Sequence, residues 1–159
     1  MTDQGRSEAI TADGLRELRA ELERLETDGR REIAARIQAA RELGDLKENA
    51  EYHIAKEDQA HLETRIKRLR ERLRDAVVVE SGSGGDRFAF GRTAEVLDRG
   101  SGEVKTWTLV GSTEADLGEG KLSAESPVGR ALLDAQAGEE VVIETPRGAK
   151  QFVVQRLLD

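Results

Sequence analysis

Two acidic side chains, three residues apart, are the groups in this chain best suited to bind a metal ion. Asp45 and Glu48 lie at a short break between two long helix-forming segments. Mg²⁺ takes oxygen ligands and is often held by one or two protein carboxylates together with substrate phosphates and water. Two carboxylates alone therefore make only a weak, shared magnesium site.

The same spacing also has a purely structural explanation. Asp-x-x-Glu in front of a helix is the pattern of a capping box, whose side chains satisfy free N–H groups at the start of the helix. Asp45 and Glu48 fit this pattern at the start of the second helical segment. A capping residue can also be a metal ligand, so both interpretations stay open on spacing alone.

Basic side chains lie close to this break in the sequence. Arg41 and Lys47 are on one side of it, and Lys56 is on the other. Contact with phosphate groups is one interpretation of these residues. Solvation of a helix face and pairing with acidic neighbours is the other, and it is also our expectation for the arginine-rich segment 65–74.

Two amphipathic segments must position these side chains. The first, over residues 15–43, follows the 3-4 spacing of a coiled coil, with a four-residue phase insertion near Gly29. The second holds that spacing over residues 52–76. Because only a few residues separate the segments, we predict an antiparallel helical hairpin with arms of roughly 40 Å, capped by Thr11 at its start and with its tip near residues 44–49.

The second half of the chain changes to patterns of period two. Four strands are predicted, in two hairpins, at residues 93–98 and 103–110, then at 140–144 and 150–155. Between the hairpins, Ser126 is a helix N-cap signal and Pro127 suits the first helical position. These patterns predict a small α+β domain of antiparallel strands with one short helix, in which Trp107 and Phe152 belong to the core.

A segment rich in serine and glycine separates the two halves. We expect an N-terminal coiled-coil hairpin over residues 1–79, a linker over residues 80–86 and a C-terminal domain over residues 87–159. No apolar run approaches 18 residues, and the N-terminus lacks the apolar stretch of a signal peptide. We therefore expect a cytoplasmic protein without a membrane partner.

Composition excludes several kinds of chemistry. The chain has 159 residues, a formal net charge of −7 and no cysteine, which excludes disulfides, thiolate nucleophiles and cysteine-bound zinc. His53 and His61 lack cysteine partners and are expected on the surface. The acidic balance also argues against a protein that coats nucleic acid through charge alone.

Three separated motifs resemble those of one protein family. They are Asp45-Leu46-x-Glu48-Asn49-Ala50-Glu51-Tyr52, then Gly111-x-x-Glu114-Ala115-Asp116 with Ser126-Pro127-Val128-Gly129-Arg130-Ala131, and finally Glu144-Thr145-Pro146-x-Gly148. On these motifs the chain is identified as a member of the bacterial Gre transcription elongation (transcript-cleavage) factors, of the GreA type. The resemblance covers residues 10–158.

This resemblance implies both the fold and the activity. The fold would be the N-terminal coiled-coil hairpin with an FKBP-like C-terminal domain. Such a factor binds backtracked or arrested bacterial RNA polymerase, inserts the hairpin through the secondary channel and stimulates the polymerase's intrinsic cleavage of the nascent RNA 3′ end. The protein would then be a monomeric activator, not an enzyme, and would take no small-molecule substrate. DNA binding is among the properties expected of such a factor.

The resemblance also assigns roles to individual residues. Asp45 and Glu48 match the acidic tip pair, the expected catalytic residues, which hold a Mg²⁺ ion shared with the polymerase active site and not bound tightly by the free protein. Arg41 and Lys56 match positions that contact the RNA. The residues that match the region docking on the channel rim are Ser123, Glu125 and Pro127.

Two other functional classes remain open. A paralogue could enter the same channel and inhibit the polymerase without promoting cleavage, although the preserved spacing of Asp45 and Glu48 favours the cleavage factor. A coiled-coil adaptor, in which these two acids serve only as a helix cap, is the third possibility. The specific tip motif argues against that adaptor.

Overall fold

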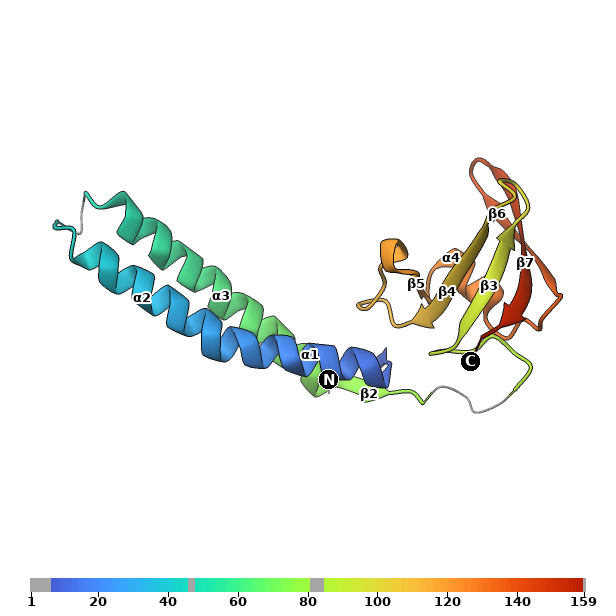
Figure 1. The fold of residues 1–159 in the computed structure, drawn as a ribbon, viewed down its shortest axis with the longest axis horizontal. Coiled ribbons are helices and arrows are strands. Elements are labelled where there is room, and N and C mark those ends of the chain that lie inside the picture. Colours follow the sequence, from blue (N-terminus) through green and yellow to red (C-terminus); the bar gives the residue numbers. More distant parts are fainter. Residues whose placement is uncertain (1–6, 46–47, 81–84, 159) are drawn as a thin grey trace, which may run out of the picture. The chain divides into compact units, whose positions relative to one another are not determined.

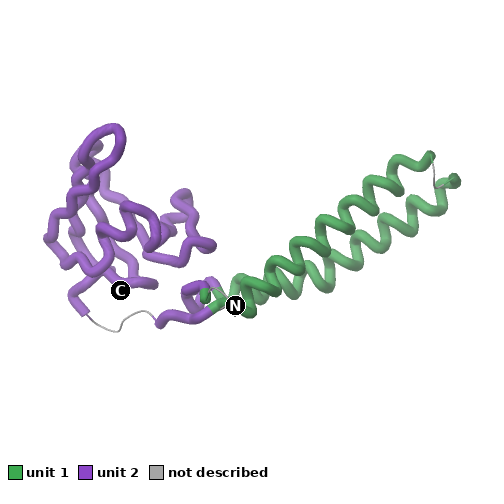
Figure 2. Tube along the Cα trace, turned by 180° about the vertical axis from the view of Figure 1, so that it is seen from behind, with its two compact units in different colours: residues 1–7, 15–76 green, residues 8–14, 77–159 purple. Residues whose placement is uncertain are grey.

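The computed structural model describes residues 7–45, 48–80 and 85–158, and it is drawn as a ribbon in Figure 1. The chain forms two compact units. One consists of residues 1–7 and 15–76, and the other consists of residues 8–14 and 77–159 (Figure 2). Lys47 and most of the predicted linker over residues 80–86 lie outside the described residues. In the described ranges, no helix combines the length and apolar character needed to cross a membrane.

The first unit is built from two antiparallel helical arms, as the spacing predicts (Figure 1). The first arm runs through α1 (Ala12–Arg24), the π-helical segment η1 (Leu25–Gly29) and α2 (Arg30–Arg41). The second arm is α3 (Ala50–Asp75), which begins two residues later than the pattern around Glu48 indicated. The predicted hairpin is confirmed, with the break between its arms at the expected place.

The phase insertion near Gly29 takes the form of the π-helical segment η1. A π-helical turn holds more residues than an α-helical one, so the apolar stripe can be rephased without ending the helix. Leu18 and Leu22 are buried before the insertion, and Ile37 and Ala40 are buried after it. The stripe therefore stays on one side of the arm and faces the buried residues of α3, which are Ala55, Ile66 and Leu69.

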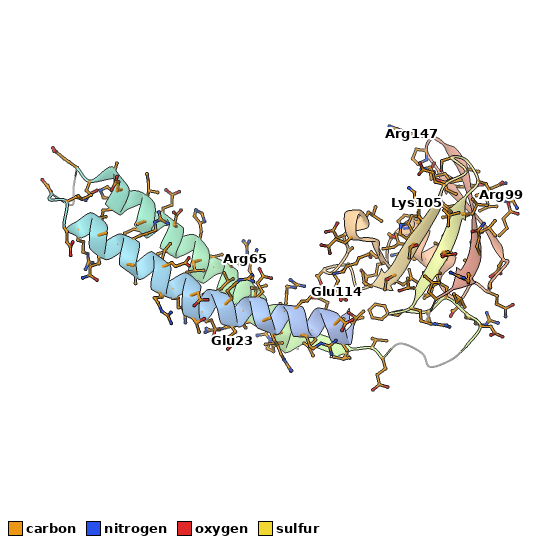
Figure 3. All side chains as sticks on the ribbon, viewed as in Figure 1. Glu23, Arg65, Arg99, Lys105, Glu114 and Arg147 are labelled. Carbon is orange, nitrogen blue, oxygen red and sulfur yellow. The ribbon has the colours of Figure 1, made fainter. Side chains whose placement is uncertain are left out.

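Charged side chains flank this apolar stripe, among them Glu23 on α1 and Arg65 on α3 (Figure 3). Ion pairs connect the arms at Glu21–Arg65, at Glu26–Arg70 (2.8 Å), at Arg30–Glu63 (2.9 Å) and at Arg36–Asp58 (2.9 Å). The first arm supplies the acid in the first two pairs and the base in the last two. Because the sign changes at η1, sliding one arm along the other would bring like charges together.

The second unit contains a mixed five-stranded sheet in the order β5-β4-β3-β7-β6. Its elements are β3 (Thr93–Asp98), β4 (Val104–Val110), η2 (Leu117–Glu119), β5 (Lys121–Ser123), α4 (Pro127–Leu132), β6 (Glu140–Thr145) and β7 (Gly148–Leu157). Both predicted hairpins and the α+β class are confirmed. The sheet is not wholly antiparallel, because residues 111–120 loop back and let β5 run parallel to the end of β4.

The core of this unit lies on one face of the sheet. Alternate residues of the central strands point into it, as shown by the fully buried Val96, Leu109 and Val154. Trp107 and Phe152 are buried with their ring centroids 5.7 Å apart, which confirms the predicted core positions. Burial of these and the other core side chains removes apolar surface from water and stabilises the unit.

Glu114 holds residues 8–14 within the second unit, and its position is labelled in Figure 3. Its carboxylate accepts hydrogen bonds from the backbone N–H of Thr11 (3.1 Å), from the Thr11 hydroxyl (2.5 Å) and from the N–H of Gly111 (3.2 Å). Thr11 in turn accepts a hydrogen bond from the N–H of Gly14 (3.0 Å), which confirms it as the cap of α1. A short strand, β1 (Glu8–Ile10), precedes this cap and pairs with β2 (Ala76–Val78).

The pairing of Arg30 with Glu63 predicts a pH-dependent stability. Arg30 donates two hydrogen bonds of 2.9 Å to this carboxylate and holds the pKa of Glu63 below its ordinary value. The stabilisation is present above the unfolded-state pKa of about 4.3 and is lost as the pH falls through the lower folded value. Glu63→Gln should lower the melting temperature slightly at neutral pH and have no effect in acid, as measured by circular dichroism. The control is Glu71→Gln, and a pH-independent loss in Glu63→Gln would contradict the pairing.

Candidate functional site

The tip of the hairpin begins where α2 ends. The N–H of Glu42 still bonds the carbonyl of Gln38 (3.3 Å), and the N–H of Leu43 bonds the carbonyl of Ala40 (3.2 Å). Gly44 then adopts a φ of +123°, a conformation that side chains other than glycine rarely tolerate. The helix therefore stops at a fixed point, just before the first of the two candidate acids.

The second arm begins with Asn49, which is the N-cap of α3. Asn49 has an extended backbone, and its side-chain oxygen accepts a hydrogen bond from the N–H of Tyr52 (3.1 Å). The capping-box interpretation of Asp45 and Glu48 is therefore wrong, because the cap comes one residue after Glu48. Asparagine is a preferred N-cap residue, so the signal was present in the sequence and competed with the overlapping Asp-x-x-Glu pattern.

Asp45 and Glu48 are both exposed at the hairpin tip. The N–H of Glu48 donates to the carbonyl of Asp45 (3.3 Å), and this bond keeps the two acidic residues close in space. Within the described ranges, no three histidine, cysteine, aspartate or glutamate residues gather to hold a metal ion. The tip thus offers two anionic ligands and depends on other molecules for the rest.

The two basic residues expected to contact RNA lie at different depths along the hairpin. Arg41 is the last residue of α2, and its guanidinium carbon lies 5.8 Å from the centre of the Tyr52 ring. Lys56 lies on α3 about 10 Å along the axis from the cap, and its ammonium donates to Gln59 (3.0 Å). The structure therefore places Arg41 at the tip and Lys56 nearly two turns behind it.

An apolar surface adjoins the tip, and no sequence pattern distinguished it from the buried stripe. Leu43 and Ile54 are large apolar residues that remain 68% and 53% exposed. A groove of 370 Å³ runs beside them, lined by Arg36, Ala39, Ala40, Leu43, Glu51, Ile54 and Ala55. The tip therefore combines acidic, basic and apolar contact groups within a short distance.

The three expected docking residues lie together in the second unit. Ser123 ends β5, Pro127 begins α4, and Glu125 is exposed between them. Ser126 caps α4 by accepting from the N–H of Gly129 (3.0 Å), and its hydroxyl donates to the carbonyl of Ser123 (2.6 Å). These bonds hold the connection in one conformation, with Glu125 and Pro127 presented to solvent.

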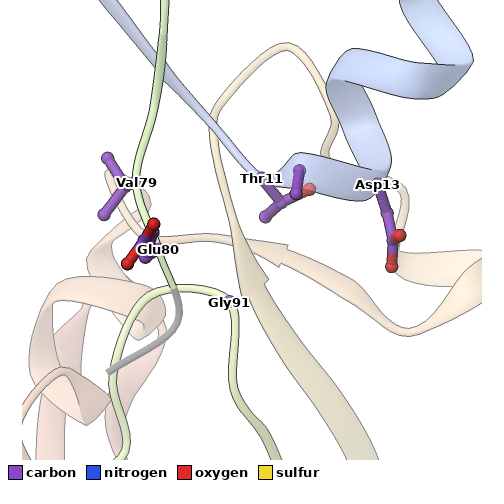
Figure 4. Close-up of a pocket in the computed structure, with 6 residues that line it drawn as sticks. Thr11, Asp13, Val79, Glu80 and Gly91 are labelled. Atoms are coloured by element: carbon purple, nitrogen blue, oxygen red, sulfur yellow. The ribbon is translucent and has the colours of Figure 1, made fainter. Parts of the chain in front are cut away.

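A cavity of 350 Å³ in the second unit is less suited than the hairpin tip to binding a phosphate. Thr11, Asp13, Val79, Glu80 and Gly91 are among the residues that line it (Figure 4). Its two charged residues are both acidic, and acidic groups repel phosphate and nucleic acid.

The exposed positions of His53 and His61 confirm the expectation that both lie on the surface.

Comparison with known proteins supports the same two-part organisation. Residues 8–78 match the family described as transcription elongation factor, N-terminal, and residues 83–157 match transcription elongation factor, GreA/GreB, C-terminal. The chain belongs to the GreA/GreB family of transcription elongation factors. The resemblance expected from the motifs is thereby confirmed.

Two relatives named GreA agree with this assignment over most of the chain. Transcription elongation factor GreA of Roseiflexus castenholzii is 46% identical over 91% of this chain and 93% of its own length. GreA of Bacillus subtilis is 42% identical over 87% and 88% of the two chains. A crystal structure of GreA factor homolog 1 (Gfh1) of Thermus thermophilus is 31% identical and covers 97% of this chain and 100% of that one, with a TM-score of 0.44.

The reassigned cap predicts which tip residue stabilises the fold. Asn49→Ala should lower the free energy of unfolding by about 1 kcal/mol, since it removes an N-cap acceptor. Glu48→Ala should leave it within about 0.5 kcal/mol, as expected of an exposed residue outside a cap. Urea unfolding followed by far-UV circular dichroism measures both. An equal loss in the two variants would restore the capping-box interpretation.

Proposed function

We propose that this protein binds backtracked or arrested bacterial RNA polymerase and stimulates the polymerase's intrinsic cleavage of the nascent RNA 3′ end, after which elongation resumes. One observation carries the proposal. Asp45 and Glu48 are exposed at the hairpin tip and joined by a backbone hydrogen bond, and Asn49 caps the following helix in their place. The two acids are therefore not needed as helix caps, and family membership supplies the partner.

The dimensions of the hairpin suit insertion into a channel. α3 has 26 residues, which corresponds to about 39 Å of helix. Two packed helices form a narrow rod, whereas the apolar core of the second unit requires a broader fold. In the proposed complex the rod enters the secondary channel of the polymerase and brings its tip to the active site.

The tip residues fit a divalent cation that the polymerase also binds. Asp45 and Glu48 would be two of its ligands, since Mg²⁺ prefers anionic oxygen atoms. A magnesium ion held there would supply positive charge, which stabilises the negative charge that develops during phosphodiester hydrolysis and makes bound water more acidic. Because the described tip residues gather no third acidic or histidine ligand around Asp45 and Glu48, the polymerase and the RNA would provide the other ligands. The protein is then an activator and not an enzyme in its own right.

The basic tip residues would contact the displaced RNA. Arg41 lies against the face of Tyr52, an arrangement that restrains its guanidinium while leaving N–H groups for a phosphate. Lys56, further along α3, would contact the RNA backbone closer to the channel entrance. Both side chains are exposed, as such contacts require.

The second unit would supply the docking surface. Ser123, Glu125 and Pro127 lie on one connection of defined conformation, and we assign them to the rim of the secondary channel. Residues 87–159 would thus form the docking domain. In this proposal the protein acts in the cytoplasm as a monomer, without a small-molecule substrate or a membrane.

The role of the acidic pair predicts a loss of chemistry without a loss of binding. Asp45→Asn and Glu48→Gln keep the size of each side chain and remove its charge, so cleavage should fall by at least about a hundredfold, the order expected for removing a charged catalytic group. The measurement is RNA shortening in a purified backtracked complex with Mg²⁺. The half-saturating protein concentration should stay unchanged.

The same assay separates a cleavage factor from an inhibitor. The unmodified protein should release short 3′ fragments only with a backtracked complex, and it should show no ribonuclease activity alone. If it instead slows nucleotide addition on complexes that are not backtracked and releases no RNA, the inhibitor is the correct assignment. Cleavage that survives both substitutions would exclude the acidic pair as metal ligands.

The docking assignment predicts the opposite kinetic signature. Glu125→Lys should raise the half-saturating concentration of the protein by at least about fivefold, since a reversed charge at an interface acts mainly on binding. The maximal cleavage rate should be retained at saturation. Glu144→Lys makes the same change of charge at an exposed residue of β6, and it serves as the matched control. Equal effects of the two substitutions would refute the assignment.

A further inference from the structure

The side chain of Asn49 forms hydrogen bonds in two directions. Its oxygen accepts from the N–H of Tyr52 at the start of α3 (3.1 Å). Its Nδ2 group donates to the carbonyl of Ala40, in the last turn of α2. One half-buried side chain therefore caps the second arm and also joins it to the first.

The joined atoms lie at the two ends of the segment that carries the acidic pair. Ala40 is buried, and its carbonyl also accepts from the N–H of Leu43 (3.2 Å). The carbonyl of Asn49 accepts from the N–H of His53 (3.2 Å), so each anchor is bonded to the backbone of a helix. A bond between these anchors ties together the two helix ends from which Asp45 and Glu48 extend.

We propose that Asn49 is a positioning residue for Asp45 and Glu48, acting through its bond to Ala40 in addition to its cap. This inference rests on the proposed function, because the positions of the carboxylates matter only if they act in a shared site. A displacement of about 1 Å in a catalytic group can cost on the order of a hundredfold in rate. The bridge between the arms restrains the backbone on either side of Asp45 and Glu48.

Asparagine is the residue that provides both bonds at this position. Aspartate and serine can accept from the N–H of Tyr52, and both are good caps. Ionised aspartate has no hydrogen to donate to the Ala40 carbonyl, and the serine hydroxyl lies too close to the backbone to bridge the two arms. Substitution by these residues therefore separates the bridge from the cap.

The experiment compares Asn49→Asp and Asn49→Ser with the unmodified full chain on one backtracked complex. Both variants should lose about tenfold or more of the maximal cleavage rate, and their half-saturating concentrations should stay within about twofold of the unmodified value. Asn49→Asp adds a carboxylate beside Asp45 and Glu48. A lower cleavage rate in this variant therefore cannot result from a lack of negative charge. Gln38→Ala removes an exposed amide from α2 and is the control, which should keep the full rate.

Amide exchange in the free protein gives a readout that does not depend on cleavage. In Asn49→Ser, the N–H of Tyr52 should stay protected because the cap is kept, while those of Leu43 and Glu48 should exchange faster. A full cleavage rate or unchanged amide exchange in this variant would overturn the proposal. An increase in the half-saturating concentration without a lower maximal cleavage rate would also overturn it. If the unmodified protein releases no RNA, the proposed function fails, and exchange alone then decides whether Asn49 restrains the loop.

Discussion

The packing of one helical arm against the other is the interaction on which the rest of the hairpin depends. Two helices form no third layer, so the apolar side chains between them supply nearly all of the buried surface that holds the arms together. The π-helical segment η1 (Leu25–Gly29) keeps this contact continuous, because the stripe would otherwise rotate away from α3. Charge pairs on the flanks add little stability in water, but the change of their sign at η1 selects one register.

The buried residues of the hairpin become smaller towards the tip. Leucine and isoleucine are buried along most of the stripe, whereas Ala40 and Ala55 are the buried residues nearest the break. In this region the carbonyl of Ala40 accepts a hydrogen bond from the side chain of Asn49. The bridge between the arms thus lies where the buried side chains of the hairpin are smallest.

Sequence periodicity predicted the long elements and failed at the short ones. The hairpin and the insertion near Gly29 followed from many residues in phase, and the two β-hairpins followed from alternation around glycine turns. β5 (Lys121–Ser123) has three residues, too few to show a period, so its parallel pairing could not be foreseen. Glu114 was visible only as part of a motif, since its bonds reach residues about a hundred positions away.

The candidate tip site was predicted by residue type, and its helix cap was misassigned for a physical reason. Asp45-x-x-Glu48 and Asn49 are overlapping cap signals, and the choice between them depends on backbone angles that the pattern does not contain. The connection between β5 and α4 contains a cap residue with the same two kinds of hydrogen bond. Ser126 caps α4 and donates to the carbonyl of Ser123, just as Asn49 caps α3 and donates to Ala40. A cap that also donates ties a helix to the element before it. Aspartate, which only accepts when ionised, cannot provide both bonds.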